Sequence, residues 1–377
     1  MSKDCQARSV TQDRDVATPH APVPALITGA SGFIGRALAQ HLHANGAVLT
    51  CLLRRPPAVP LPGAQLLCAD FSDEPQLQAQ LHRAAPEIVF HLAGSTAPVY
   101  PQTFDTELRA TEALLRAAAA MERPPRIVLI GSAAEYGPLT TAALPAGEHT
   151  PCAPVTPYGA AKLSQTRMAL AAAAAGVPVV VARLFNIIGP GMGPHLAMGR
   201  FARALAALPS TGGVLRTGHL GALRDVVALG DAVRVLSELA VHPHVVGRVV
   251  PVCTGHAVRM DELVQMLIDA CGMDVQVEIE HAQRGVSSVD VMLGDTSCLQ
   301  ALGIAVPRVD LGACIEALWT AQRLDSPASA SAVADANAVA PAFAGCVASA
   351  PGARLKMQPT DAGIHARRSA PTAAAGD

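Results

Sequence analysis

The residues best suited to chemistry are Tyr158 and Lys162, four positions apart in the stretch PVTPYGAAK. The alanine-rich segment 157–176 predicts a helix, and side chains four residues apart lie on one face of it. An ammonium beside a phenol favours the phenolate, so we expect Lys162 to lower the pKa of Tyr158 from its usual value of about 10. Such a tyrosine can donate and accept protons near neutral pH.

A serine extends this pair into a predicted proton-transfer site. Ser132 ends the apolar run RIVLIGS, which predicts a buried strand, and its hydroxyl can hydrogen-bond the same substrate oxygen as Tyr158. A Tyr-x-x-x-Lys spacing is common by chance, and the alternative is an exposed pair on a helix surface. The serine and a glycine-rich motif, in this order ahead of the pair, favour the catalytic interpretation.

The glycine-rich motif is LITGASGFIG at residues 26–35, with Gly29, Gly32 and Gly35 three apart. A glycine turn between a strand and a helix lets the backbone approach a pyrophosphate, and the helix N-terminus supplies amide donors. The alternative is a tight turn that needs a positive φ at one glycine. Because the motif lies at the first strand–helix turn of an alternating chain, it predicts a NAD(P) site.

The end of the second predicted strand bears on the choice of cofactor. An acidic residue there would bind the ribose hydroxyls of NAD, but the chain has Arg54 and Arg55, whose guanidinium groups suit a 2′-phosphate. The alternative is a solvated basic pair. We therefore expect NADP(H), with NAD(H) as the second possibility. Asp70, at the end of the third strand, is placed to meet the adenine amino group or to cap a turn.

The elements that must position these residues alternate along the chain. Apolar runs at 25–30, 47–53, 64–70, 87–94, 126–132 and 177–186 predict strands, and segments of helical periodicity separate them. Runs that are apolar throughout indicate burial on both faces, so the fold class is α/β with a doubly wound parallel sheet, a Rossmann fold. We expect a disordered leader (1–23), an NAD(P)-binding Rossmann domain (24–186), a smaller α/β substrate-binding region with returning Rossmann elements (187–324) and an Ala/Pro/Ser-rich disordered tail (325–377).

Composition excludes several classes of partner. The net charge is −2 and there is no basic stripe, so we expect neither a nucleic acid nor a membrane surface as partner. The first residues carry both signs of charge without an apolar segment, which predicts a cytoplasmic protein. Nine cysteines without C-x-x-C spacing predict small buried residues and no metal site.

Six motifs in order give the chain a family resemblance: TGASGFIG, VFHLAG, IGSAAEYG, PVTPYGAAK, ARLFNIIGPG and ALRDVV. Over residues 24–323 the chain resembles the extended short-chain dehydrogenases/reductases, in the NAD-dependent epimerase/dehydratase family that acts on nucleotide sugars. The resemblance implies a Ser132–Tyr158–Lys162 catalytic triad, with Lys162 also on the nicotinamide ribose. It implies a cofactor cleft beside His91 and a homodimer formed through the Tyr/Lys helix. The implied cofactor-binding residues are Gly29, Ser31, Gly32, Phe33, Ile34, Gly35, Arg54, Arg55, Asp70, Phe71, Leu92, Ala93, Gly94, Tyr158 and Lys162. The implied substrate-binding residues are Thr96, Asn186, Arg224 with Asp225 beside it, and Arg284.

The stretch GSAAEYG reduces the number of reaction types that the chain could catalyse. Sugar 4,6-dehydratases of the family carry an Asp-Glu or Ser-Glu pair where this chain has Ala133 and Ala134. Alanine cannot move a proton, so water elimination is disfavoured. Glu135 is one position off and, in an extended segment, points to the opposite face. Within the family, ARLFNIIGPGM and LRDVVALGDAVRVL are most similar to reductases of GDP-linked 4-keto-6-deoxy sugars. That resemblance implies hydride transfer to C4 with Tyr158 as the proton donor.

Three departures from the family pattern keep alternatives open. Glu107 replaces the usual asparagine, Ile187 stands where these reductases often carry histidine, and GVSSVD follows Arg284 in place of a shorter R-P-x-D stretch. The enzymatic alternative is a nucleotide-sugar 4-epimerase that retains NAD, against which Arg54 and Arg55 count. The second alternative is a non-catalytic NADP(H) sensor, which has no need of an intact triad.

Overall fold

The computed structural model describes residues 23–325 apart from 58, 62, 72, 95–101 and 281–288. At 102–106 and 325 it describes the backbone alone. These residues belong to the first of two units of the chain, Met1–Phe343, and the second unit is Ala344–Asp377. The predicted leader apart from Val23, and the predicted tail apart from Asp325, lie outside the described residues.

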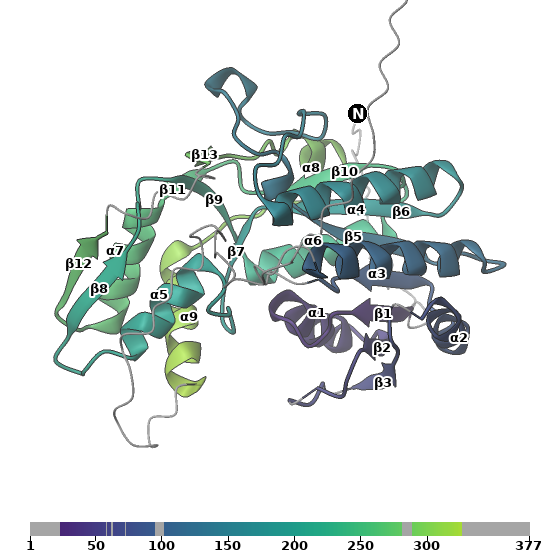
Figure 1. Ribbon diagram of the computed structural model, residues 1–377, viewed down its shortest axis with the longest axis horizontal. Coiled ribbons are helices and arrows are strands. Elements are labelled where there is room, and N and C mark those ends of the chain that lie inside the picture. The colour runs from purple at the N-terminus through teal and green to yellow at the C-terminus, as the bar shows by residue number, and fades with distance from the viewer. Residues whose placement is uncertain are drawn as a thin grey trace, which may run out of the picture. The chain divides into compact units, whose positions relative to one another are not determined.

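Seven parallel strands form the central sheet, in the order β10-β6-β5-β4-β1-β2-β3 (Figure 1). Their bounds are β1 Pro24–Thr28, β2 Val48–Leu53, β3 Ala64–Cys68, β4 Ile88–His91, β5 Arg126–Ser132, β6 Val179–Leu184 and β10 Val249–Val252. The strand order reverses between β1 and β4, as in a doubly wound sheet. The predicted fold class is confirmed.

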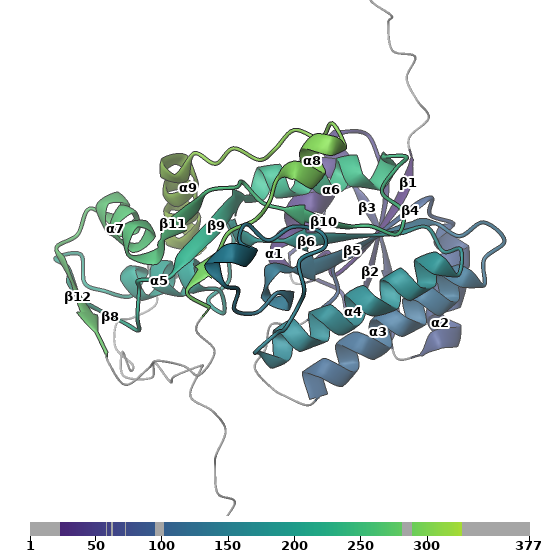
Figure 2. The same ribbon diagram turned by 90° about the horizontal axis from the view of Figure 1, so that it is seen from above.

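Helices cover both faces of the sheet (Figure 2). One apolar core lies between the sheet and the pair α1 (Phe33–Ala44) and α6 (Leu229–Val241). A second core lies between the other face and α2 (Glu74–Ala84), α3 (Gln102–Ala119) and α4 (Pro157–Ala174). Successive strand residues serve the two cores in turn: Leu26 is in the second and Ile27 in the first, because side chains alternate across a strand.

Two strands add detail to the predicted elements. The predicted strand at 177–186 ends at Leu184, and Asn186–Ile188 forms a separate strand, β7, which pairs with β9 rather than with the central sheet. A seventh strand, β10, follows the six predicted ones and joins the edge of the central sheet beside β6, as a Rossmann element that returns from the region 187–324.

The remaining elements build a smaller region beyond the carboxyl ends of the strands (Figure 1). A four-stranded sheet contains β7, β9 (Leu223–Ala228), β11 (Ala257–Arg259) and β13 (Val291–Met292), and β8 (Gly213–Thr217) pairs with β12 (Val275–Ile279). A third core joins α5 (Ala197–Ala206), α7 (Met260–Cys271) and α9 (Leu311–Asp325). The short α8 (Ser297–Ala301) packs against β10. Among the helices described, none is long and apolar enough to cross a membrane.

Candidate active site

A cavity of about 800 Å³ lies where the carboxyl ends of the central strands meet the smaller region. Its walls come from the glycine turn after β1, the ends of β4, β5 and β6, the first turns of α4, and segments 184–198, 224–226, 260–263 and 289–292. Parallel strands bring their carboxyl ends to one edge of the sheet, where ligands bind in doubly wound folds. The sites predicted from distant motifs are therefore adjacent in space.

The glycine turn is shaped for close approach of a ligand. Gly29 has a φ of 73°, and a Cβ there would lie 2.7 Å from the backbone of Leu92 and Ala93. A Cβ at Gly35 would clash with the carbonyl oxygen of Gly29. The N-cap of α1 is Gly32, which has no side chain to occupy the first amides of the helix. The cavity is lined by Gly29, Gly32, Phe33, Ile34 and Gly35. The free amides at this helix N-terminus and the space kept by the glycines fit a pyrophosphate, as in a dinucleotide cofactor.

Ser132, Tyr158 and Lys162 all line this cavity. Helix α4 begins at Pro157, with Thr156 as its cap: the Thr156 hydroxyl accepts a hydrogen bond from the Gly159 amide over 3.0 Å. Lys162 is 6% exposed, and its Nζ donates to the carbonyl oxygen of Ile130 in β5 over 3.2 Å. The lysine thus joins α4 to the strand that ends at Ser132.

The electrostatics of the tyrosine differ from the prediction. Burial raises the pKa of Tyr158 to about 12, the hydrogen bond with Ser132 acts in the opposite direction, and the carboxylates of Glu107 and Glu135 raise it further. The expected lowering is wrong, because burial of the phenol outweighs the influences that favour its charged form. Burial also lowers the pKa of Lys162, against which the two carboxylates act. In this environment Tyr158 is a neutral phenol at physiological pH, the form that donates a proton.

His91 does not line the cavity, contrary to the expectation from resemblance. It is 1% exposed, and its ring nitrogens lie 2.8 Å from the Thr28 hydroxyl and 3.1 Å from the Thr111 hydroxyl. Burial, and secondarily the charge of Lys162, lower its pKa to about 3, so the ring is neutral. Thr28 in turn accepts a hydrogen bond from the amide of Ala93. His91 therefore supports the backbone beneath the glycine turn.

On the substrate side, Asn186 and Arg224 line the cavity and Asp225 does not. The Asn186 amide donates to the carbonyl oxygen of Asp225 over 3.0 Å. The Asp225 carboxylate is fully buried and accepts hydrogen bonds from the amides of Thr254, Gly255 and Gly294, and from the Thr254 hydroxyl. It ties β9 to two loops, next to Arg224 in the cavity lining.

Other predicted residues lie away from the described cavity lining. Arg54 and Arg55 are exposed just beyond β2, Asp70 is exposed two residues beyond β3, and Ser31 is exposed in the glycine turn. Phe71 is buried in the core beneath α2, α3 and α4, and Ala93 packs against that core, whereas Leu92 and Gly94 reach the cavity. Thr96 and Arg284 lie outside the described residues.

The cavity also contains residues that the sequence analysis missed. Its outer wall is rich in sulfur and aliphatic groups, from Met192, Leu196, Met198, Met260, Leu263, Val289 and Met292, with His195 as a polar neighbour. Apolar residues of three separate segments, 192–198, 260–263 and 289–292, carry no shared sequence signal and are easily taken for core. Ile187, noted as a departure from the family, also lines the cavity. Within the described ranges, no group of three or more His, Cys, Asp or Glu is arranged to hold a metal ion.

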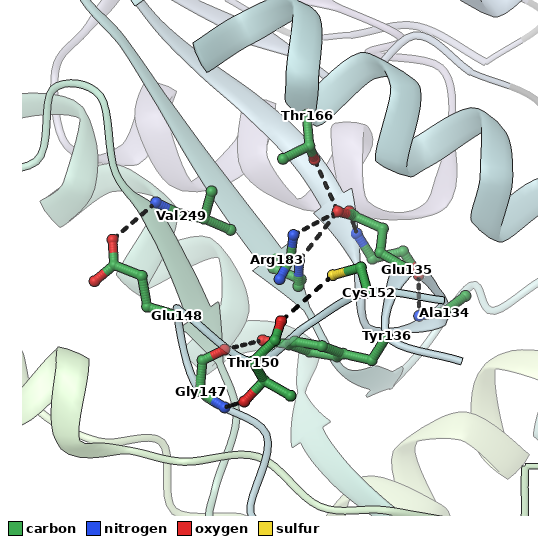
Figure 3. A network of polar contacts seen from close by, with 11 residues as sticks. Ala134, Glu135, Tyr136, Gly147, Glu148, Thr150, Cys152, Thr166, Arg183 and Val249 are labelled. Carbon is green, nitrogen blue, oxygen red and sulfur yellow. Dashed lines mark hydrogen bonds and ion pairs between the residues drawn. The ribbon is translucent and has the colours of Figure 1, made fainter. Parts of the chain in front are cut away.

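The segment after Ser132 is a 3₁₀ turn (Ala133–Glu135) and not the extended strand assumed for Glu135. Glu135 is fully buried in an ion pair with Arg183, 2.7 Å between Oε2 and Nη2, rather than turned to an opposite strand face (Figure 3). The correction follows from the turn, which rotates the carboxylate into the core between β5, β6 and α4.

The fold is a doubly wound sheet, and one cavity contains a glycine turn and a tyrosine and lysine one helical turn apart. These features define a dinucleotide-dependent oxidoreductase of the short-chain type. Residues 25–253 match the NAD dependent epimerase/dehydratase family, and the chain belongs to this family. The predicted family is confirmed.

Relatives of known name are similar over most of the chain. The chain is 35% identical over 313 residues to dTDP-6-deoxy-L-talose 4-dehydrogenase (NAD(P)(+)) of Kitasatospora kifunensis, covering 81% of this chain and 97% of the relative. It is 29% identical over 287 residues to GDP-6-deoxy-D-mannose reductase of Pseudomonas aeruginosa, covering 72% and 90%. The solved structure of RMD from Pseudomonas aeruginosa complexed with NADPH aligns with a TM-score of 0.67 at 26% identity, covering 80% and 98%.

Proposed function

We propose that this protein is an NADP(H)-dependent reductase of a nucleotide-linked 4-keto-6-deoxy sugar. The observation that carries the proposal is that Ser132, Tyr158 and Lys162 line the same cavity as the glycine turn that fits a pyrophosphate. A tyrosine that holds its proton at neutral pH is suited to donate it to a carbonyl oxygen as that oxygen gains charge.

Different residues of the chain have different roles in the proposed carbonyl reduction. Gly29, Gly32, Gly35 and the first amides of α1 would hold the pyrophosphate of the cofactor, whose nicotinamide supplies the hydride when bound. Tyr158 passes its phenolic proton to the C4 oxygen, and the ketone becomes an alcohol. The Lys162 ammonium stabilises the phenolate left behind, and the Ser132 hydroxyl hydrogen-bonds the same oxygen. Solvent then returns a proton to Tyr158.

The outer wall of the cavity supports a deoxy sugar. Met192, Met198, Met260 and Met292 present adaptable apolar surface, which suits a methyl group better than a hydroxymethyl group. We assign Asn186 and Arg224, two polar residues of the lining, to the nucleotide diphosphate. The two relatives reported above carry names that refer to 6-deoxy sugars linked to dTDP and to GDP. We take the GDP-linked 4-keto-6-deoxymannose type as the first candidate and the dTDP-linked sugar as the second.

The choice of NADP(H) rests on Arg54 and Arg55, which follow β2 beside β1 and are exposed to receive a 2′-phosphate. The solved relative bound to NADPH is consistent with this choice. Homodimerisation through the Tyr/Lys helix and a cytoplasmic location stay predictions.

The test is turnover by the purified protein with NADPH or NADH and GDP-, dTDP- and UDP-linked sugars. We expect NADPH oxidation with a 4-keto-6-deoxy sugar nucleotide, and a loss of about 10²- to 10⁴-fold in kcat for Tyr158→Phe with NADPH binding retained. Tightly bound NAD and interconversion of UDP-sugars without net NADPH use would instead identify a 4-epimerase. NADPH binding without turnover on the whole panel would identify a sensor.

A further inference from the structure

The Glu135 carboxylate accepts hydrogen bonds from four donors on three elements, and Figure 3 shows Thr166 and Arg183 directed at it. Its Oε1 accepts from the Ser132 amide at the end of β5, over 2.7 Å. Its Oε2 accepts from the Thr166 hydroxyl of α4 over 2.9 Å, and from Nε and Nη2 of Arg183 in β6 over 3.1 and 2.7 Å. The carboxylate is fully buried and Arg183 is 3% exposed, so these hydrogen bonds lie away from solvent, where they are electrostatically stronger than in water.

The contacts of Glu135 link the two halves of the candidate active site. Thr166 lies one helical turn beyond Lys162, on the helix face that also carries Tyr158. Ser132 comes from the other side of the carboxylate, and its hydroxyl accepts a hydrogen bond from the Ala134 amide over 3.2 Å. The carboxylate therefore joins the strand end that bears the serine to the helix face that bears the tyrosine and lysine.

The surroundings of the carboxylate are built to hold it in one position. A Cβ at Gly131 would lie 2.6 Å from the Glu135 Oε1, so any larger residue there would push the carboxylate out of this position. The guanidinium of Arg183 stacks on the Tyr136 ring at 4.5 Å, and the Tyr136 hydroxyl donates to the Gly147 carbonyl oxygen over 2.7 Å. A buried ion pair adds little net stability, because desolvation offsets its attraction. Together with the Ser132 and Thr166 donors, the ion pair fixes the orientation of the Glu135 carboxylate.

We infer that Glu135, held by Arg183, is a positioning residue that sets Ser132 against Tyr158 and Lys162. The inference rests on the proposed function, because it takes this cavity as the place where a substrate oxygen receives its proton. Glu135 itself contacts neither cofactor nor substrate in this role and moves no proton. A misplacement of about 1 Å in such a group can cost about 100-fold in rate.

Glu135→Gln tests the inference because all four partners are donors. A glutamine has one oxygen and one NH₂ group, so in either orientation its NH₂ faces the Ser132 amide or the Arg183 guanidinium. We expect kcat to fall about 10- to 100-fold, with KM for the sugar nucleotide and the Kd of NADPH changed less than about threefold. In Glu135→Gln/Arg183→Gln, the glutamine oxygen can accept from Ser132 while its NH₂ donates to the second glutamine. We expect this double variant to regain most of the lost kcat.

The chain offers a matched control in Glu148 (Figure 3). Glu148 also accepts from one arginine, Arg248, through Nε and Nη2, and from one backbone amide, that of Val249 in the edge strand β10. Glu148→Gln repeats the same donor conflict away from the cavity. We expect it to lower Tm while leaving kcat within about twofold of the wild type. Equal losses of kcat in the two variants, or unchanged kcat in a folded Glu135→Gln protein, would overturn the inference.

A milder pair of variants applies if Glu135→Gln does not fold. Thr166→Val removes one donor and keeps the ion pair, and we expect a several-fold fall in kcat that Thr166→Ser restores. A fall that Ser does not restore would count against positioning through the hydroxyl.

Crystal structures separate this inference from the proposed function. If the wild type reduces no sugar nucleotide, the proposed function fails, but the position of the Ser132 hydroxyl relative to Tyr158 can still be compared between variants. A displacement of about 1 Å in Glu135→Gln and none in Glu148→Gln supports positioning. An unmoved Ser132 in Glu135→Gln overturns it.

Discussion

Glu107 and Lys162 approach the same glycine from two helices. A Cβ at Gly94 would lie 3.6 Å from the Glu107 carboxyl carbon and 3.4 Å from the Lys162 Nζ. Both side chains are buried, at 4% and 6% exposure, and the carboxylate raises the pKa of both Lys162 and Tyr158. The departure from the family pattern thus places a charge beside the proposed proton donor.

Glu107→Gln should shift the pH dependence of reduction. Removing a negative charge that raises the pKa of Tyr158 and Lys162 lowers both values, so the alkaline loss of kcat/KM should begin at a lower pH. The measurement is a pH–rate profile for ketone reduction. Glu112→Gln is the control, because Glu112 lies on the same helix in an exposed ion pair with Arg116. An unmoved alkaline limb in the Glu107 variant would contradict this role.

Gly35→Ala should damage the cofactor cradle. The added Cβ would clash with the Gly29 carbonyl oxygen, so the turn must shift. We expect the free energy of unfolding to fall by about 1–3 kcal/mol and NADPH binding to weaken, measured by denaturant titration and by NADPH fluorescence. Gly230→Ala in α6 is the control: its Cβ meets no atom within 4 Å, and alanine stabilises a helix by up to about 1 kcal/mol. Equal NADPH affinity in both variants would refute the cradle.

Arg54→Ala/Arg55→Ala should separate the two cofactors. Loss of guanidinium contacts to a 2′-phosphate should raise the Kd of NADPH about tenfold to a hundredfold and leave that of NADH nearly unchanged. Calorimetric titration with each cofactor measures the effect. Arg83→Ala/Arg123→Ala, at two other exposed arginines, removes the same two charges and controls for net charge. A parallel loss for NADPH and NADH would argue against 2′-phosphate recognition.

His91 should make the protein acid-sensitive. Its pKa is about 3 in the folded protein against 6.5 unfolded, so the unfolded chain binds a proton that the folded protein excludes. The contribution of neutral His91 is complete above pH 6.5 and is lost towards pH 3, by about 1.4 kcal/mol per pH unit. Unfolding free energies at pH 7 and pH 5 measure it, and His91→Gln should show a smaller difference between them. The exposed His82 provides the control substitution, and a pH difference unaffected by His91→Gln would exclude this origin.

Features encoded by local spacing were predictable from the sequence. The glycines after β1 and the Tyr158–Lys162 pair depend on one turn or one helix face, and the alternation of apolar runs indicates the parallel sheet. The strand order then brings these motifs to one sheet edge. The methionines of the outer wall were missed, because they come from separate segments whose apolar character fits a core equally well.

The sequence by itself determined the class of the fold, the family and the candidate residues for proton transfer, since these follow from residue types at fixed spacing. Only the tertiary structure decided the pKa values of these residues and the contacts that hold them in place. The pKa of Tyr158 rises because burial removes water from the phenol, which no neighbour four residues away reveals. Glu135 holds Ser132 because a 3₁₀ turn directs its carboxylate between β5, α4 and β6, and convergence of three distant segments is a property of the folded chain alone.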